Sequence, residues 1–253
     1  MKRWEHFVWP LAAVAASLAA WQLGVWWTGA HIFPSPTDVQ HGLAHLAHKG
    51  VLLRYIGGSL GRVGMGYVLG VTCGIPLGVV LGWYPAANTT VNPAVQMLRP
   101  ISPLAWIPLA IVWFGIGNFA AIFLIFVGSF FPVVVSTANG VRNIPDVFLR
   151  AGSNFGLSQV GLLKRVVFPA ALPQIIVGLR ISLGVAWLVV VAAEMIAVDS
   201  GLGYLIIDSR NAGKRYDLVV AGMLLIGLIG LALDTGMRRL ERLKSVRWGF
   251  RHE

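Results

Sequence analysis

Long apolar stretches alternate with short polar ones along most of the chain. Six of them are long enough to cross the hydrocarbon core of a bilayer, which takes about 20 residues of helix. They are residues 7–27, 59–83, 94–114, 119–137, 174–198 and 218–237. The longest stretch without membrane character lies between the fourth and fifth spans, at residues 141–172. The pattern predicts an all-α, polytopic membrane protein with one transmembrane domain over residues 1–253.

Composition and charge agree with a membrane protein and indicate its orientation. Charged residues make up only 12% of the chain, about half of the roughly 25% found in soluble proteins. Nucleic-acid binding would need the net charge of +10 to gather on one folded basic face. Instead, Lys and Arg concentrate at the N-terminus, in residues 141–172 and in the tail from Arg238, as expected of cytoplasmic segments. Both termini are therefore expected in the cytoplasm, although the first inner turn, residues 84–93, carries no charge.

The first span could be retained or removed. Lys2, Arg3 and the small-residue stretch AAVAAS would also suit a cleaved signal peptide. A retained span is expected, because further spans follow and nothing resembles a secreted domain.

The first outer segment, residues 29–58, is predicted to hold a weakly amphipathic helix. His41, His45 and His48 share one face of this helix. They could bind a metal ion, but no carboxylate or cysteine accompanies them, and a solvated interfacial helix is the alternative. The single cysteine, Cys73, lies in an apolar run and is expected to be inertly packed.

The second span carries glycine at every fourth position. These residues form one smooth ridge along a helix: Gly66, Gly70, Gly74, Gly78 and Gly82. Close backbone approach is a main source of helix association in a bilayer. The ridge predicts a tight helix–helix contact, and a gating surface is the alternative.

Prolines and charges mark three further places in the spans. Pro100, Pro103 and Pro108 would free backbone carbonyls, so the third span is expected to be kinked and either buried or beside a pore. Arg180, near the inner end of the fifth span, is expected to extend back to the interface. Glu194 lies among apolar neighbours near the outer end of that span. A structural hydrogen bond or ion pair and a role in gating both fit such a residue.

Two short helices with a glycine-permitted bend are predicted between Asp146 and Pro173. Pro169 and Pro173 are expected to close this segment before the chain re-enters the bilayer. The segment is too short for a domain and too apolar for a loose linker, so it is expected to dock on a partner. The sequence holds no phosphate loop, HExxH, GxSxG or Cys–His cluster, and no intramembrane series of carboxylates and histidines. These features favour a conduit that is driven by a separate protein.

Several stretches resemble the permease subunits of bacterial ABC importers, in particular those for nitrate, sulfonate, taurine and bicarbonate. The resemblance covers about residues 33–240 and is carried by FPSPTDV, PLAWIPLAIVWFGIGN, FFPVVVSTANGV, LRAGSNFGLSQVGLLKRVVFPAALP and GLGYLI. It implies the type I importer permease fold, in which the loop at 141–172 forms coupling helices that sit in a groove of an ATP-hydrolysing subunit.

The resemblance also assigns residues. Such permeases carry a Glu-Ala-Ala signature followed by Gly. Ala151 and Gly156 match the first Ala and that Gly, whereas Arg150 and Gly152 replace the Glu and the second Ala. The residues expected to couple to the ATPase are Arg150, Ala151, Gly152, Gly156, Leu157, Lys164, Arg165, Pro169 and Pro173. The candidates for lining or gating the translocation path are Arg99, Ser102, Trp106 and Glu194, with plain packing or anchoring as the alternative.

The implied assembly is a permease homodimer in the bacterial inner membrane, with two ATPase subunits and an external solute-binding protein that is periplasmic or lipid-anchored. No metal or cofactor is expected in this chain, because ATP and Mg²⁺ would be used by the ATPase. The expected solute is a small anion of the sulfonate, taurine, nitrate or bicarbonate type. The alternative is a secondary transporter or channel that works without an ATPase.

Overall fold

The computed structural model describes residues 5–29 and 33–241, so Lys2, Arg3 and the tail beyond Glu241 lie outside the described residues. Nearly all described residues are helical and none forms a strand, which confirms the all-α polytopic prediction. The helices are α1 (Glu5–Thr28), α2 (Pro36–His48), α3 (Leu52–Trp83), α4 (Pro85–Leu98), α5 (Ile107–Phe114), α6 (Asn118–Arg142), α7 (Asp146–Asn154), α8 (Gln159–Leu162), α9 (Phe168–Ala197), α10 (Leu202–Gly213) and α11 (Tyr216–Glu241). A 3₁₀ turn (Pro103–Trp106) precedes α5, and a π-helical turn (Leu163–Val167) joins α8 to α9.

Five continuous helices are long and apolar enough to span a membrane, and a sixth span is broken. The third predicted span is not one helix, because α4 and the segment Pro103–Phe114 meet at an angle of 86°. The turn predicted at 84–93 is also wrong, since α4 begins at Pro85. Proline is favoured in the first turn of a helix, where its missing N–H has no partner to lose.

The broken span is kinked near the predicted prolines but is not buried within one chain. Met97 in α4 is 71% exposed and Val112 in α5 is 78% exposed. Pro100 and Pro103 end regular helical bonding after α4, so the two halves diverge instead of packing as one rod. The expectation that this span is buried is therefore wrong for the single chain. That it lies beside a pore stays a prediction.

Helices α3 and α6 run parallel in backbone contact along the glycine ridge. A Cβ added to Gly66 would lie 2.7 Å from the Ile125 side chain, and one added to Gly82 would lie 2.6 Å from Val141. Gly70, Gly74 and Gly78 face Ser129, Val133 and Thr137 in the same register. Each step of four residues on α3 is thus matched by a step of four on α6. Helix α3 has 32 residues, or about 48 Å, so it must tilt within a hydrocarbon core of about 30 Å.

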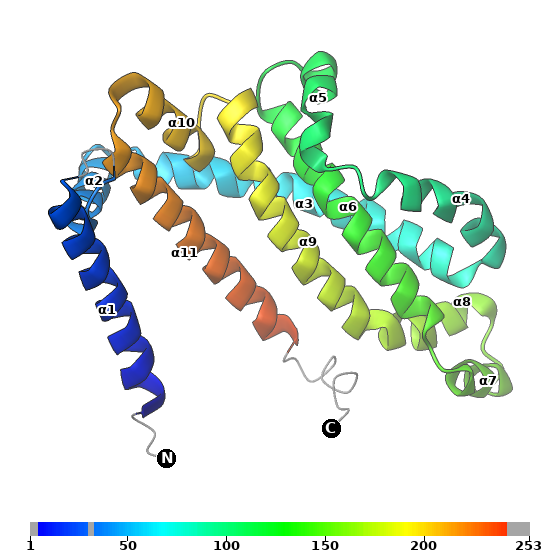
Figure 1. Cartoon of the computed structure of the whole chain (residues 1–253). Coiled ribbons are helices and arrows are strands. Elements are labelled where there is room, and N and C mark those ends of the chain that lie inside the picture. The colour runs from blue at the N-terminus through cyan, green and yellow to red at the C-terminus, as the bar shows by residue number, and fades with distance from the viewer. Residues whose placement is uncertain (1–4, 30–32, 242–253) are drawn as a thin grey trace.

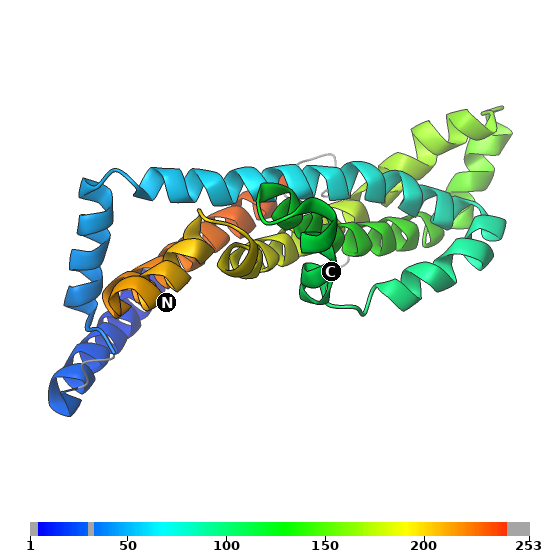
Figure 2. The ribbon, with the colours of Figure 1, turned by 90° about the horizontal axis from the view of Figure 1, so that it is seen from above.

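Helices α6, α9 and α11 lie side by side, with α3 across one side of them (Figures 1 and 2). The buried core gathers where α3, α6 and α9 meet. Helix α1 stands apart from this core and has its main contacts in the chain with α2. Cys73 is exposed, so the expectation of a packed cysteine is wrong for the single chain: it lies on a face of α3 turned away from the glycine ridge.

Charged groups join the first half of α9 to the C-terminal end of α11. The Arg180 guanidinium lies 2.7 Å from the Asp234 carboxylate and 3.3 Å from that of Glu241. Arg180 is therefore held by ion pairs within the chain, where the sequence predicted an extension toward the interface. The segment between α9 and α11 contains a further helix, α10.

Candidate coupling surface and outer polar cluster

The segment Asp146–Val167, called the coupling surface here, projects from one end of the molecule. In Figure 1 it lies at the same end as the start of α1 and the end of α11. Four of its large apolar side chains are exposed: Val147 by 66%, Phe148 by 46%, Phe155 by 87% and Val160 by 62%. Exposed apolar side chains gathered on a segment outside the spans indicate a site for a protein partner.

Glycines shape the bend in this surface. Gly156 adopts φ +74°, which favours glycine, and closes α7 in a Schellman motif. The Leu157 N–H donates to the Gly152 carbonyl over 3.2 Å, and the Gly156 N–H donates to the Ser153 carbonyl over 2.9 Å. Gly152 is buried, and a Cβ there would lie 2.5 Å from the Leu162 side chain. The missing side chain lets α7 pack directly on α8.

The prolines do not close the segment as predicted. The helical path is continuous from Gln159 to Ala197, through the π-helical turn and into α9. Pro169 falls in the first turn of α9, just after the π-helical turn, where an N–H can be missing without a kink. Pro173 lies inside α9 and is buried. The part of the coupling surface from Gln159 onward and the fifth span are therefore one continuous helical element.

The other residues expected to couple are placed in two ways. Ala151, Lys164, Arg165 and Pro169 are exposed, as is Arg150, whose 3.9 Å approach to Asp146 is a weak surface pair. Leu157 is half-buried below them. The exposed members could touch a partner directly, whereas the buried Gly152 and Pro173 could act only through packing.

A second candidate site lies at the opposite end of α9. Glu194 is fully buried, and its carboxylate lies 2.6 Å from the guanidinium of Arg62, which is 6% exposed. Ser59 Oγ donates to the same carboxylate over 2.8 Å. The remaining bonds of Arg62 run from Nε to Asn118 Oδ1 over 2.7 Å, from Nη1 to the Ser200 carbonyl over 3.0 Å and from Nη2 to Ser200 Oγ over 2.5 Å. These five residues, Ser59, Arg62, Asn118, Glu194 and Ser200, are called the outer polar cluster.

The outer polar cluster also anchors the start of α10. The Gly203 N–H donates to Glu194 Oε2 over 3.0 Å, and the Leu202 N–H donates to Ser59 Oγ over 2.9 Å. Gly201 adopts φ +105°, and a Cβ on it would collide with the Glu194 carboxylate. One buried carboxylate thus fixes α3, α9 and the turn into α10 relative to one another.

The other candidates for the translocation path do not join this cluster. Arg99 is exposed at the end of α4, and Ser102 caps the 3₁₀ turn by accepting from the Leu104 N–H. Trp106 is half-buried, and its ring packs edge-on against Phe123. No hydrogen bond or ion pair connects these residues to Glu194 within the described parts of the chain.

Sequence reasoning missed Arg62, although a signal was present. Arg62 lies inside the second predicted span, and an ionised residue at such a position needs an opposite charge. Glu194 needed a partner for the same reason. A comparison of the depths of Arg62 and Glu194 in their predicted spans would have predicted the ion pair between them.

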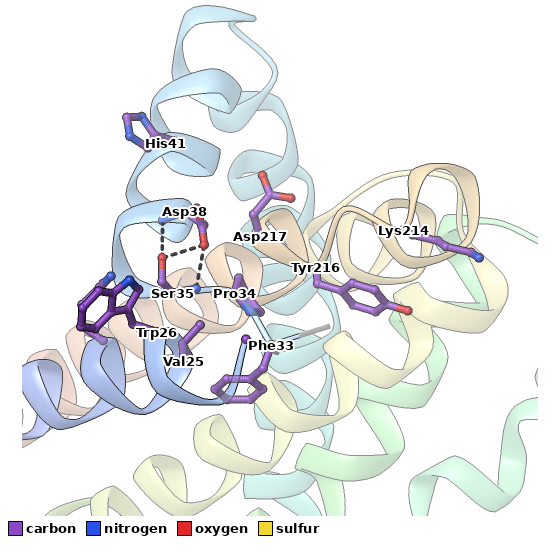
Figure 3. Close-up of a pocket in the computed structure, with 12 residues that line it drawn as sticks. Val25, Trp26, Phe33, Pro34, Ser35, Asp38, His41, Lys214, Tyr216 and Asp217 are labelled. Carbon is purple, nitrogen blue, oxygen red and sulfur yellow. Dashed lines mark hydrogen bonds between the residues drawn. The ribbon is translucent and has the colours of Figure 1, made fainter. Parts of the chain in front are cut away.

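A cavity of about 520 Å³ opens beside the histidine-bearing helix, between the end of α1 and the starts of α2 and α11 (Figure 3). Asp38 and Ser35 form a capping box at the start of α2, and these hydrogen bonds from Ser35 hold the pKa of Asp38 below its usual value. His41 lines this cavity with Asp38 and Asp217. No group of three or more His, Cys, Asp or Glu side chains is arranged to hold a metal ion within residues 5–29 and 33–241.

Comparison with known sequences identifies relatives along most of the chain. The taurine transport system permease protein TauC of Escherichia coli is 36% identical over 251 residues, which cover 92% of this chain and 90% of TauC. The nitrate import permease protein NrtB of Synechococcus elongatus is 38% identical over 189 residues, which cover 74% of this chain and 68% of NrtB.

Solved structures support the same fold. An inward-facing structure of the MetNI methionine ABC transporter matches with a TM-score of 0.66 at 22% identity and covers 78% of this chain and 97% of that one. A bacterial alginate ABC transporter, in complex with its alginate-bound periplasmic protein, matches with a TM-score of 0.63 at 17% identity and covers 96% and 98%. The family model for the inner membrane component of binding-protein-dependent transport systems matches residues 74–246. The chain therefore belongs to this family of ABC transporter permeases.

Proposed function

We propose that the protein is the permease subunit of an ATP-driven importer and forms the translocation path for a small oxyanion. The observation that carries the proposal is the continuous helical path from Gln159 in the coupling surface to Ala197, past Glu194. A packed helix moves as a body, so a displacement at Gln159 would reach the outer polar cluster along one helical path.

The proposed partners are assigned to the exposed apolar surfaces of the chain. An ATPase subunit would dock on the exposed apolar side chains of the coupling surface and would use ATP and Mg²⁺, while this chain binds no cofactor. A second copy of the chain would cover the exposed face of the broken span, where Met97 and Val112 lie. Two ATPases and an external solute-binding protein complete the proposed assembly. The solute-binding protein is supported by the family, whose transport systems depend on a binding protein.

The proposed location is the bacterial inner membrane, with both ends of the chain in the cytoplasm. The start of α1, the end of α11 and the coupling surface lie at one end of the molecule, which supports a common side. Arg142, Lys164 and Arg165 at that end agree with a cytoplasmic side.

The class of solute is proposed from the relatives. TauC and NrtB carry the names of taurine and nitrate transport, and both solutes present a small oxyanionic group. A sulfonate, nitrate or similar anion is the solute that we propose for this chain.

Replacing Phe155 by aspartate tests the proposed docking. Phe155 is 87% exposed in the coupling surface, so the change should spare the fold and place an unpaired charge in the ATPase contact. The complex is reconstituted with its ATPase and binding protein in proteoliposomes, and ATP hydrolysis and solute uptake are measured. We expect a loss of at least tenfold in stimulated hydrolysis, on the order of 1.4 kcal/mol of lost coupling.

The matched control is Ile116→Asp. Ile116 is 77% exposed in the turn before α6, at the other end of that helix from the coupling surface. It should leave stimulated hydrolysis within about twofold, a change that corresponds to less than 0.5 kcal/mol. Equal losses in the two variants, or full uptake by the permease alone, would contradict the proposal and favour a channel or secondary transporter.

A further inference from the structure

A cavity of about 330 Å³ lies on the outer half of α3, beside the outer polar cluster. It is lined by residues that include Arg54, Gly57, Gly61, Arg62, Asn118 and Ser200, and it is called the outer groove here. Arg54, Gly57 and Gly61 recur at steps of three and four residues, which places them along one face of the helix, and Arg62 borders that face. Asn118, at the start of α6, and Ser200, before α10, supply the other walls.

The charges around the outer groove favour an anion. Arg54 and Arg62 bring two guanidinium groups to the lining, which holds no carboxylate. Glu194 lies behind Arg62 and balances one of them, so the groove keeps a net positive charge. Within the described residues no ion pair is found for Arg54.

Arg62 also keeps donor capacity for a ligand. A guanidinium has five N–H donors. Four hydrogen bonds from Arg62 are accounted for by Asn118, Glu194 and Ser200, which leaves one N–H without an acceptor among the described residues. Because Asn118 accepts through its Oδ1, its side-chain amide N–H₂ remains available to donate. The groove therefore offers fixed donors and a positive potential at the same place.

Glycine makes room at this site. A Cβ on Gly57 or on Gly61 would meet nothing within 4 Å, so the α3 wall is bare backbone open to the groove. A Cβ on Gly58 would lie 3.6 Å from Arg62 Nη1, so the guanidinium lies along this glycine and reaches toward Ser200. The volume is at the lower end of the range of about 300–1,000 Å³ for ligand pockets, which suits a small solute.

We propose that the outer groove binds a small oxyanion, with Arg54 and Arg62 supplying the charge and Asn118 and Arg62 the free N–H donors. A cation would meet two guanidinium groups, and an apolar solute would leave Arg54 without a counter-charge. The proposal rests on the proposed function in one respect, since it identifies the groove as an outer station of the translocation path. It assigns selectivity to the residues of α3, and not to Arg99, Ser102 or Trp106.

Cysteine reporters on the bare glycine wall test the proposal. Gly61→Cys and, separately, Gly57→Cys are made in full-length chains that carry Cys73→Ala and are reconstituted in proteoliposomes. Each thiol is treated with a methanethiosulfonate that bears a sulfonate and with one that bears a trimethylammonium group. The sulfonate reagent should react about tenfold faster than the cationic one, because a cleft lined by one sign of charge concentrates counter-ions. Arg54→Gln should remove most of this preference, and nitrate or taurine, but not choline, should slow the reaction.

The matched control is Gly64→Cys. Gly64 is an exposed glycine of α3 with open space for a Cβ, and it is outside the groove lining. Equal rates for the two reagents, the same preference at Gly64→Cys, or no reaction at either reporter would overturn the proposal. ATP hydrolysis by the reconstituted complex is measured on the same samples. Normal stimulated hydrolysis without anion preference defeats only the groove, whereas absent hydrolysis with a preserved preference defeats only the proposed function.

Discussion

Replacing Arg62 by leucine is expected to lower the free energy of unfolding by about 3–5 kcal/mol, because Glu194 would stay buried without its counter-ion. The carboxylate is fully buried and lies 2.6 Å from the guanidinium, so solvent cannot take over the role of Arg62. The loss should appear as a lower midpoint of unfolding for the full chain in detergent, followed by intrinsic tryptophan fluorescence.

A double mutant separates the ion pair from simple loss of packing. Arg62→Leu combined with Glu194→Leu should lose less stability than the sum of the two single changes, because no buried charge is left unpaired. The control is Arg238→Ala, which removes a pair to Asp234 whose side chains are 59% and 37% exposed and should cost about 0.2–0.5 kcal/mol. An Arg62→Leu chain as stable as the Arg238→Ala chain would refute the role given to the outer polar cluster.

Adding one methyl group to α3 is expected to have opposite effects at two nearby glycines, Gly66 on the ridge and Gly64 outside it. Gly66→Ala should destabilise by about 1–3 kcal/mol, as overpacking of a tight contact does. Its new Cβ would lie 2.7 Å from Ile125 and 2.8 Å from the Ile122 carbonyl, which is backbone and cannot rotate away. Gly64→Ala meets nothing within 4 Å and should stabilise α3 by up to about 1 kcal/mol through helix propensity.

The same unfolding assay measures both glycine variants, and the sign of the difference is the decisive result. A Gly66→Ala chain at least as stable as the parent would mean that α3 and α6 are not in backbone contact. A strongly destabilised Gly64→Ala chain would mean that its open face is covered in the assembled protein.

The sequence allowed a tight contact of α3 with another helix to be predicted, without naming α6, because its cause is local. A glycine at every fourth position exposes backbone on one side of a helix whatever the rest of the chain does. The bend at Gly156 was predictable for a similar reason, since a glycine there permits the left-handed conformation that ends α7. In both cases one stretch of sequence contains the whole physical explanation.

The outer polar cluster could not be predicted from the sequence, because it depends on how the helices are arranged in space. Arg62 and Glu194 are 132 residues apart in the chain, and they meet only once α3 and α9 have opposite directions and a common depth. The continuity of the coupling surface with α9 was missed because Pro169 was taken as a helix stop. Pro169 interrupts no regular hydrogen bonding of α9, because it lies in the first turn of that helix, directly after the π-helical turn.

The 39-residue helical path from Gln159 to Ala197 is about 58 Å long, nearly twice the thickness of a hydrocarbon core. In the assembly proposed above, a helix of that length would transmit a tilt from one side of the membrane to the other. An inward movement of its cytoplasmic end would then move its outer end outward. One inward movement on the cytoplasmic side would then open the outer side of the translocation path at the same time, as alternating access requires.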